Sequence, residues 1–511
     1  MEGRSVDDLL IGSWSMRPGV AVVTDEGSVS WASLRDRVER LAAVIDERVR
    51  PGGHVAVAGA NTPETLVSYL ACLVSGRAPV GINPKLARDE FAYLIDDAGI
   101  ELLLGGAGVA QTVDSLDTRH GFTGLYWGGD AAESSWQAAI EAAQPNGTRP
   151  AAAPVAPLLY TSGTSGRPKG TRVRWVADPG QTVAEHIEQL ASAGRMLPEG
   201  PHQVAGPLYH NGPLIAVRAL LAGRTIVLPS RFDARGFLRL VQENGSASSV
   251  MVPTHLSRLL ALESAERESF DTSSLQKVIL TGAACPADVK RAVIRWWGPV
   301  VEEVYGGTES GTLCRISATE WLDHPGSVGR TVPGFQAVVV DRDGTPQDPG
   351  TTGRLYFRDA SLRGIQYHNA PDKTAQAHLE PGTFTLGDVG YLDADGYVHI
   401  TDRDVDMVVS GGVNIYPAEV ERVLSQCPAV TDVAVIGVPN TDMGEELRAL
   451  VSVSGPVTEA DLDTFCRQQL AGYKCPRSYQ FVDRLPRNDM GKLNKRQLRQ
   501  TFWPDTRTIG G

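Results

Sequence analysis

Apolar and polar residues alternate along the first 280 or so positions in a pattern that switches between helical and strand-like spacing. Apolar residues from Ser30 to Val49 recur at helical intervals, and the run Val55 to Ala58 that follows is typical of a buried strand. The same alternation gives a helix over 63–74, a strand over 78–82, a helix over 87–98, and strands over 101–104, 225–228, 249–252 and 277–280, with a helix over 234–244. Because strands that alternate with helices form parallel sheets covered on both faces, the pattern predicts doubly wound α/β subdomains.

The pattern changes beyond about residue 335, where short strands are separated by Asp/Gly turns. Strands are expected over 337–340, 353–357 and within 391–400, which predicts a β-rich subdomain. Residues 128–156 are rich in Ala, Pro and Gly around one short helix over 135–143, and they are interpreted as a surface connection.

A compact α+β pattern follows residues 402–404, where a domain boundary is expected. It consists of a helix over 417–425, strands over 433–436 and 449–453, and a helix over 460–470. Thr458 stands three residues before Asp461, which is the capping-box arrangement of a helix N-terminus.

Composition restricts the class of protein. A chain of 511 residues is too long for one core and suggests about three units. The net charge of −12 gives no general electrostatic reason to bind nucleic acid or anionic membrane. Acidic residues near the N-terminus and the absence of a long apolar run predict a cytoplasmic protein without a transmembrane segment. The six cysteines are scattered, which indicates buried thiols instead of a zinc site or disulfide framework.

The segment from Thr161 to Gly170 has the composition of a phosphate-binding loop. Its glycines allow converging backbone N–H groups, its hydroxyls add donors, and Lys169 adds a positive charge. Only two residues separate Gly166 from Lys169, so the spacing differs from that of a P-loop NTPase. The alternative is a flexible Ser/Gly-rich linker.

Further polar clusters appear in a fixed order along the chain. They are the loop Leu208 to Pro213, the segment Val304 to Ser310, the pair Gly387-Asp388, Arg403, and the segment Leu485 to Lys495. Together with the phosphate loop, this series resembles the adenylate-forming superfamily of acyl-CoA synthetases, peptide-synthetase adenylation domains and luciferases. The resemblance covers nearly the whole chain. The segments Val250 to Thr254, Trp296 to Pro299 and Ser410 to Pro417 are most similar to the bacterial fatty-acyl-CoA-ligase branch.

The resemblance implies a fold and a division of labour. A large N-terminal domain, residues 1–402, would contain two doubly wound α/β subdomains plus the β-rich subdomain and would bind ATP and the acid. A small, mobile α+β domain, residues 403–511, would act as a lid that carries the catalytic lysine and the acceptor tunnel. Asp404 occupies the hinge position.

The family pattern also assigns residues to ATP and Mg²⁺. Thr161 and Glu309 resemble the residues that place Mg²⁺, and Tyr305 would lie against adenine, although a core tyrosine is the alternative. Asp388 would accept hydrogen bonds from the ribose, with Arg403 beside it. The remaining positions expected at ATP are Ser162, Gly163, Thr164, Ser165, Gly166, Lys169, Gly282, Ala283, Gly306, Gly307 and Thr308.

Lys492 resembles the catalytic lysine that reaches the α-phosphate, and the alternative is a solvated surface lysine. It is grouped with Glu309 and Thr161 as the catalytic set, because charge neutralisation and positioning dominate this chemistry. Ser410, Gly411 and Gly412 would close a tunnel for the pantetheine of CoA.

The acid pocket is expected at Tyr209, His210, Asn211, Thr254, Gly282, Ala283 and Gly307. Glycine at 307 removes a side chain from the pocket wall, which favours a bulky cyclic or aromatic acid. His210 either orients the acid or is structural. Two departures from the family pattern are Leu386 in place of a threonine, and Asn488-Asp489-Met490 before Lys492.

The sequence therefore predicts an ATP- and Mg²⁺-dependent ligase that makes an acyl-adenylate and transfers the acyl group to CoA. A second hypothesis keeps the adenylation step but changes the acceptor to a carrier-protein thiol, an amine or nitrite. A third, of another class, is a catalytically inactive nucleotide-binding regulator.

Overall fold

The computed structural model describes residues 14, 17–113, 116–119, 121–128, 135–144, 153–161, 168–175, 177–341, 343–403, 406, 408–410, 413–440, 443–470, 472–488, 491 and 493–502. Contacts divide the chain into two units. The first unit comprises Met1–Thr281, Val289–Gly311 and Ile365–Thr374, and the second comprises Gly282–Asp288, Thr312–Gly364 and Ala375–Gly511.

One sheet of the first unit has the strand order β6-β5-β3-β4-β7-β8. Its strands are β3 (His54–Ala58), β4 (Ala78–Gly81), β5 (Ile100–Gly106), β6 (Thr123–Trp127), β7 (Leu158–Thr161) and β8 (Lys169–Arg172). All neighbours pair in parallel except β8, which runs antiparallel to β7 at the edge of the sheet. Val57 pairs with Gly81 on one side and with Leu104 on the other, which places three apolar strands in one register.

The strands of the second sheet that lie in this unit follow the order β13-β12-β11-β9-β10-β1-β2. Its strands are β1 (Val20–Thr24), β2 (Gly27–Ser30), β9 (His202–Val204), β10 (Ile226–Leu228), β11 (Ser248–Met251), β12 (Lys277–Leu280) and β13 (Val301–Gly307). Among these strands, β2 runs antiparallel to β1, and the other neighbouring pairs with a described register are parallel. The carboxyl ends of β9, β11, β12 and β13 therefore meet at one edge, where ligands of open α/β sheets bind.

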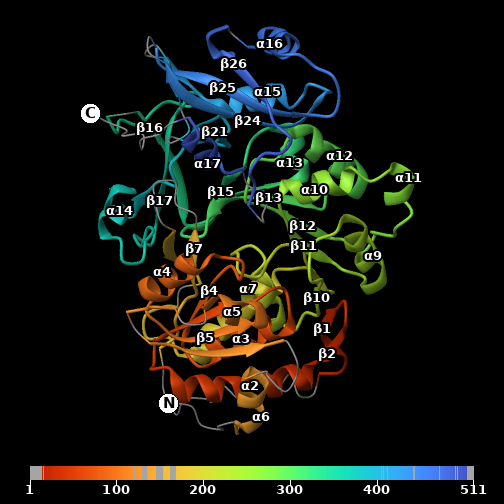
Figure 1. The fold of residues 1–511 in the computed structure, drawn as a ribbon, viewed down its shortest axis with the longest axis vertical. Helices are drawn as coiled ribbons and strands as arrows, with labels where there is room; N and C mark the ends of the chain where they lie inside the picture. Colours follow the sequence, from red (N-terminus) through yellow and green to blue (C-terminus); the bar gives the residue numbers. More distant parts are fainter. Residues whose placement is uncertain are drawn as a thin grey trace. The chain divides into compact units, whose positions relative to one another are not determined.

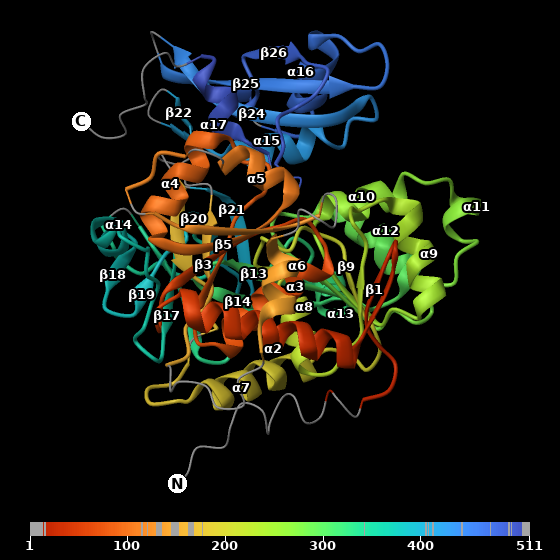
Figure 2. The same cartoon turned by 60° about the horizontal axis from the view of Figure 1, so that its bottom comes forward.

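Helices cover both faces of the first sheet. The cluster that contains Val55 and Leu102 also holds apolar residues of α2 (Trp31–Arg48), α3 (Pro63–Val74), α7 (Val183–Arg195) and α8 (Ile215–Leu221), together with Ile226 of the second sheet. The opposite face, with Ala56 and Leu103, packs against α4 (Arg88–Ala98) and α5 (Ala107–Val113), as Figure 2 shows. The remaining helices of this part are α6 (Ser135–Ala142), α9 (Ala234–Asn244), α10 (Pro253–Leu260), α11 (Ser264–Arg267) and α12 (Ala287–Trp297).

The second unit begins with β-rich structure. Strands β16 (Phe335–Val340), β17 (Gly353–Asp359), β18 (His378–Glu380), β19 (Thr383–Phe384), β20 (Asp388–Leu392) and β21 (Val398–Arg403) form a sheet of order β18-β19-β17-β20-β21, and β16 pairs with β17. Strands β14 (Gly311–Ser317) and β15 (Arg330–Thr331) pair with each other, and the short helices are α13 (Ala318–Asp323) and α14 (Pro371–Gln376).

The C-terminal part of this unit is a sheet with helices on both faces. Strands β22 (Val408–Ser410), β23 (Val413–Ile415), β24 (Val430–Asn440) and β25 (Gly444–Val453) follow the order β23-β22-β25-β24, and β26 (Ser478–Phe481) pairs with β25. Helices α15 (Pro417–Leu424) and α16 (Glu459–Arg467) pack on one face, and α17 (Lys495–Gln500) packs on the other (Figure 1). A short 3₁₀ helix, Gly472–Lys474, precedes β26.

The α/β expectation is confirmed, including the change to β-rich structure near residue 335. Thr458 caps α16, and its hydroxyl accepts from the N–H of Asp461 at 3.2 Å. The helix expected over 460–470 is shorter, and the strand expected over 433–436 extends from Val430 to Asn440. The domain boundary expected at 402–404 stays a prediction. Among the described residues, no helix is both long and apolar enough to cross a membrane.

Candidate active site

The phosphate-loop segment is framed by the hairpin of β7 and β8 in the first unit. Thr161 at the end of β7 is the register partner of Lys169 at the start of β8. The sequence predicts a loop over all of 161–170, but Thr161 is the last residue of β7, and Lys169 and Gly170 begin β8. Gly170 approaches two side chains closely, because a Cβ there would lie 3.1 Å from both His368 Cβ and Tyr160 Cζ. Ser162, Gly163, Thr164, Ser165 and Gly166 lie outside the described residues.

A segment from much later in the chain lies beside β8. Thr171 and Tyr367 form an antiparallel β-bridge, and the N–H of His368 donates to the carbonyl of Gly170 at 2.8 Å. The Lys169 ammonium lies 5.0 Å from the centroid of the Tyr367 ring, within cation–π range. The Tyr367 hydroxyl donates to Glu309 Oε1 at 3.3 Å. Two predicted ATP-site residues, Lys169 and Glu309, thus both contact the side chain of Tyr367, which lies outside the predicted motifs.

Glu309 lies in the turn that follows β13. The N–H of Gly307 donates to Ser310 Oγ at 2.8 Å, and Ser310 is fully buried, so this turn is fixed from inside. A Cβ on residue 307 would lie 2.9 Å from Glu309 Oε2. Glycine at 307 therefore gives the Glu309 carboxylate room, in addition to any effect on the acid pocket. Tyr305, half-buried, is on the same strand, and Gly306 and Thr308 belong to the same strand and turn.

Burial lowers the pKa of Lys169, with a smaller lowering effect from Lys373 and an opposing effect from Glu309. Lys169 is partly buried, and the Glu309 carboxylate is the counter-charge that favours its protonated form. An anion that binds here would restore to the ammonium part of the electrostatic stabilisation that it lost on burial.

A buried ion pair links β13 to α12. Lys290 Nζ of α12 contacts Glu303 Oε2 of β13 at 2.5 Å, and the Lys290 side chain has no exposed surface. Burial raises the pKa of Glu303, and the Lys290 ammonium opposes that shift. Since Glu303 is two residues before Tyr305, the pair anchors the strand that presents the predicted adenine contact.

Several candidates for the acid pocket lie at the carboxyl edge of the second sheet. Tyr209, which is 8% exposed, and His210 have ring centroids 4.6 Å apart, in a turn that follows β9. Asn211 precedes Gly212, whose added Cβ would lie 3.3 Å from Val250 of β11. Thr254, in the first turn of α10, follows β11 in the chain, and Gly307 ends β13. Strand topology thus puts Tyr209, Thr254 and Gly307 at one edge.

In the second unit, the two predicted ribose residues are register partners. Asp388 at the start of β20 pairs with Arg403 at the end of β21, and Asp388 is 6% exposed. Gly387 has φ +79°, and its N–H donates to Thr385 Oγ1 at 2.9 Å. Gly282, with φ +88°, and Ala283 are exposed residues of this unit.

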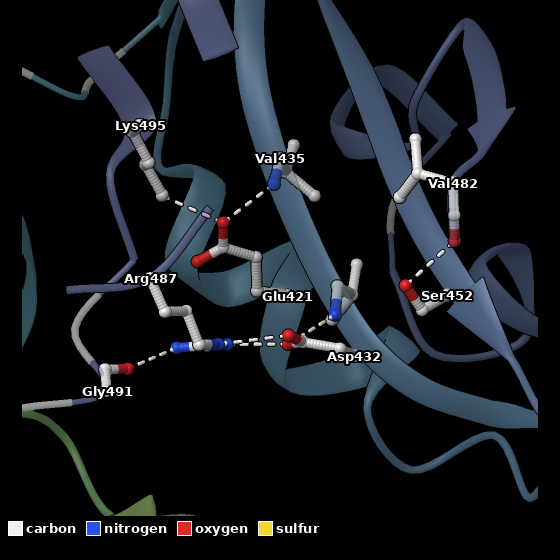
Figure 3. Close-up of polar contacts among 9 residues, drawn as sticks. Glu421, Asp432, Val435, Ser452, Val482, Arg487, Gly491 and Lys495 are labelled. Atoms are coloured by element: carbon white, nitrogen blue, oxygen red, sulfur yellow. Dashed lines mark hydrogen bonds and ion pairs between the residues drawn. The ribbon is translucent and has the colours of Figure 1, made fainter. Parts of the chain in front are cut away.

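The loop predicted to carry the catalytic lysine is held at both ends (Figure 3). Arg487 and Leu493 form an antiparallel bridge, and Arg487 Nη1 donates to the carbonyl of Gly491 at 2.7 Å. The same guanidinium forms a bidentate pair with Asp432 of β24, with Nε to Oδ2 at 2.9 Å and Nη2 to Oδ1 at 2.5 Å. Lys492, between Gly491 and Leu493 in the chain, lies outside the described residues.

Just beyond this loop, Lys495 contacts Glu421 of α15 at 2.9 Å, and Glu421 also accepts from the N–H of Val435 at 2.6 Å (Figure 3). The start of α17 is thereby tied to two other elements. Ser410, which is 7% exposed on β22, is the register partner of Gly444. Gly411, Gly412 and the expected hinge residue Asp404 lie outside the described residues.

Sequence reasoning missed two residues with polar contacts at these places, Tyr367 and Arg487. The only local signal for Tyr367 was an aromatic residue beside His368 in a polar stretch. Arg487 stood inside the selected segment Leu485 to Lys495, but nothing in the sequence named Asp432 as its partner.

Comparisons with known proteins agree with the order of motifs. Residues 14–363 match the family described as AMP-binding enzyme, and residues 419–492 match the AMP-binding enzyme C-terminal domain. A feruloyl-CoA synthase from an Amycolatopsis species is 34% identical, over 96% of this chain and 99% of its own length. A 2-succinylbenzoate–CoA ligase from Bacillus licheniformis is 31% identical, over 94% of this chain and 96% of its own length.

Among solved structures, ATP-bound MatB from Rhodopseudomonas palustris is similar over 98% of each chain, with a TM-score of 0.82 and 30% identity. The family match covers well over half of the chain, and both the full-length relatives and this fold agree with it. The chain therefore belongs to the AMP-binding enzymes, the adenylate-forming superfamily that the series of motifs indicated.

Proposed function

We propose that this protein activates a carboxylic acid with ATP, releases pyrophosphate, and transfers the acyl group from the acyl-adenylate to CoA, which gives an acyl-CoA and AMP. The proposal rests on the contacts of Tyr367 with both Lys169 and Glu309. Lys169 is the first residue of β8, directly after the predicted phosphate loop. A cation beside a phosphate-type loop and a carboxylate beside that cation are the groups needed to hold a metal-bound triphosphate.

The residues present fit a Mg²⁺ ion. Glu309 offers a hard oxygen ligand, and glycine at 307 leaves free the space that a Cβ would occupy beside that carboxylate. Thr161 and Glu309 would hold the ion. Bound there, it would neutralise charge that develops on the phosphates.

Other residues would orient the reactants. Tyr305 would lie against adenine, and Asp388 with Arg403 would bind the ribose side. Lys492 would reach the α-phosphate and the carboxylate oxygens, where its charge offsets the transition-state charge of adenylation. Ser410, Gly411 and Gly412 would line the approach of the CoA thiol, which then displaces AMP.

Residues 1–402 are proposed as the domain that binds ATP and acid, and residues 403–511 as the lid, with Asp404 at the hinge. The two family matches support this boundary, because the first ends at residue 363 and the second begins at residue 419. We further propose a bulky, aromatic or cyclic acid as substrate. The absence of a side chain at 307 and the names of the two curated relatives favour that class.

The test is ATP–pyrophosphate exchange with a panel of aromatic, cyclic and fatty acids, followed by mass spectrometry of the products formed with CoA. Acid-dependent exchange and an acyl-CoA product are expected. Pyrophosphate exchange without an acyl-CoA product would indicate that the acceptor is a carrier-protein thiol, an amine or nitrite instead of CoA. Absence of exchange with every acid, despite ATP binding, would favour the inactive regulator.

A further inference from the structure

Tyr367 is held in place by contacts that do not involve the predicted substrates. Its backbone is bridged to Thr171, and the Thr171 hydroxyl donates to the carbonyl of Gln366 at 3.2 Å. On its other side, His368 Nε2 and Asn369 Nδ2 lie 3.1 and 2.8 Å from the carbonyl oxygen of Asp97. The segment is therefore fixed against both β8 and the end of α4, and the ring has a defined position.

That position places two different faces of one side chain against two different groups. The ring face lies 5.0 Å from the Lys169 ammonium, and the hydroxyl reaches Glu309 Oε1 at 3.3 Å. An aromatic face attracts a cation, while a phenol donates to a carboxylate, so each contact is chemically favourable. The two partners come from different sheets of the first unit, β8 and the turn after β13.

We propose that Tyr367 is a positioning residue that sets the Glu309 carboxylate and the Lys169 ammonium at the separation needed for a magnesium-bound triphosphate. Its hydroxyl restrains one carboxylate oxygen and leaves the other, Oε2, for the metal. Its ring holds the ammonium toward the phosphates. This inference rests on the proposed function, in which Glu309 binds Mg²⁺ and Lys169 faces the phosphates.

Two substitutions separate the two contacts. Tyr367→Phe removes the hydroxyl and keeps the ring, so only the Glu309 contact is lost. Tyr367→Leu removes both contacts. Tyr93→Phe is the matched control, because the Tyr93 hydroxyl donates to the carbonyl of Pro168 at 3.0 Å on the same hairpin.

The readouts are the Mg²⁺ concentration for half-maximal ATP–pyrophosphate exchange, the KM for ATP at saturating Mg²⁺, and the Mg²⁺ dependence of ATP-induced thermal stabilisation. For Tyr367→Phe we expect the Mg²⁺ requirement to rise about ten-fold, as for loss of one hydrogen bond to a charged group, with kcat retained at saturating Mg²⁺. Tyr367→Leu should show this change plus a KM for ATP raised about three-fold through loss of the cation–π contact. Tyr93→Phe should leave the Mg²⁺ requirement unchanged.

An unchanged Mg²⁺ requirement in Tyr367→Phe would overturn the proposal, as would a fall in kcat that saturating Mg²⁺ does not restore. The thermal measurement separates this failure from failure of the proposed function. If ATP stabilises the unsubstituted protein equally with Mg²⁺ and with a chelator, the result contradicts the proposed Mg²⁺-dependent function itself. If the stabilisation needs Mg²⁺ and Tyr367→Phe behaves identically, only the role of Tyr367 is refuted.

Discussion

The Arg487–Asp432 pair offers a direct way to change how the lysine loop is held without changing the lysine. Arg487 makes three hydrogen bonds, two to Asp432 and one to the carbonyl of Gly491. Both charged side chains are about one-third exposed, at 32% and 29%, so solvent weakens the pair. A partly exposed bidentate pair contributes about 1 kcal/mol. The charged hydrogen bond to Gly491, discounted for the same exposure, adds about 1 kcal/mol.

These values predict a graded series. Asp432→Ala removes the pair but leaves the contact with Gly491, and should slow adenylation about five-fold, the factor for about 1 kcal/mol. Arg487→Ala removes all three hydrogen bonds and should slow it up to about thirty-fold, the factor for about 2 kcal/mol. The double variant should resemble Arg487→Ala, because Asp432 acts through Arg487.

The assay is single-turnover formation of acyl-adenylate, compared with thioester formation from supplied acyl-adenylate. Only the first half-reaction should slow, since the loop is proposed to serve adenylation. Arg467→Ala is the control, because it breaks a similar exposed pair with Asp463 at 2.6 Å on α16, away from the loop. Equal slowing of both half-reactions by Arg487→Ala, or strict additivity in the double variant, would contradict a role of this pair that is specific to adenylation.

Two further predictions concern residues that support the site, Lys290 and Gly307. Lys290→Met leaves the buried Glu303 carboxylate without its partner and should lower the free energy of unfolding by about 3 kcal/mol at pH 8. Because burial raises the pKa of Glu303, the loss should be small below the unfolded-state pKa and grow as pH rises through the folded-state pKa. Urea titrations at pH 5 and pH 8 check this, and a loss independent of pH would contradict it. Gly307→Ala places a Cβ 2.9 Å from the Glu309 carboxylate and should raise the Mg²⁺ requirement for pyrophosphate exchange about ten-fold, as if about 1.4 kcal/mol of metal binding were lost. An unchanged Mg²⁺ titration would show that this carboxylate does not hold the metal.

Much of the fold could be predicted because buried parallel strands appear as continuous apolar runs. The run Val55 to Ala58 and the run Leu102 to Leu104 both became central strands. Strand β8 escaped prediction because it is an edge strand whose residues Lys169 to Arg172 include no large apolar side chain. Its extended conformation depends on pairing with β7, which local sequence does not reveal.

In the candidate site, too, residues within local sequence motifs could be predicted, whereas residues defined by long-range contacts could not. Glu309 and Lys169 were selected because their neighbours are unusual in composition and appear in a characteristic order. Tyr367 was missed because its contact with Glu309 spans 58 residues and depends on a bridge to β8, a strand that was itself not predicted. Arg487 was missed for a similar reason, since its partner Asp432 is 55 residues away on another element.

The rates of the two half-reactions in the Lys492→Ala variant provide the most direct test of the proposed two-step mechanism. We predict that formation of acyl-adenylate from ATP and acid falls at least about a hundred-fold, as for loss of one preorganised charge-stabilising group. Thioester formation from supplied acyl-adenylate and CoA should remain close to that of the unsubstituted enzyme. Equal loss of both half-reactions, or full retention of adenylation, would contradict the assignment of Lys492 and the two-step ligase mechanism built on it.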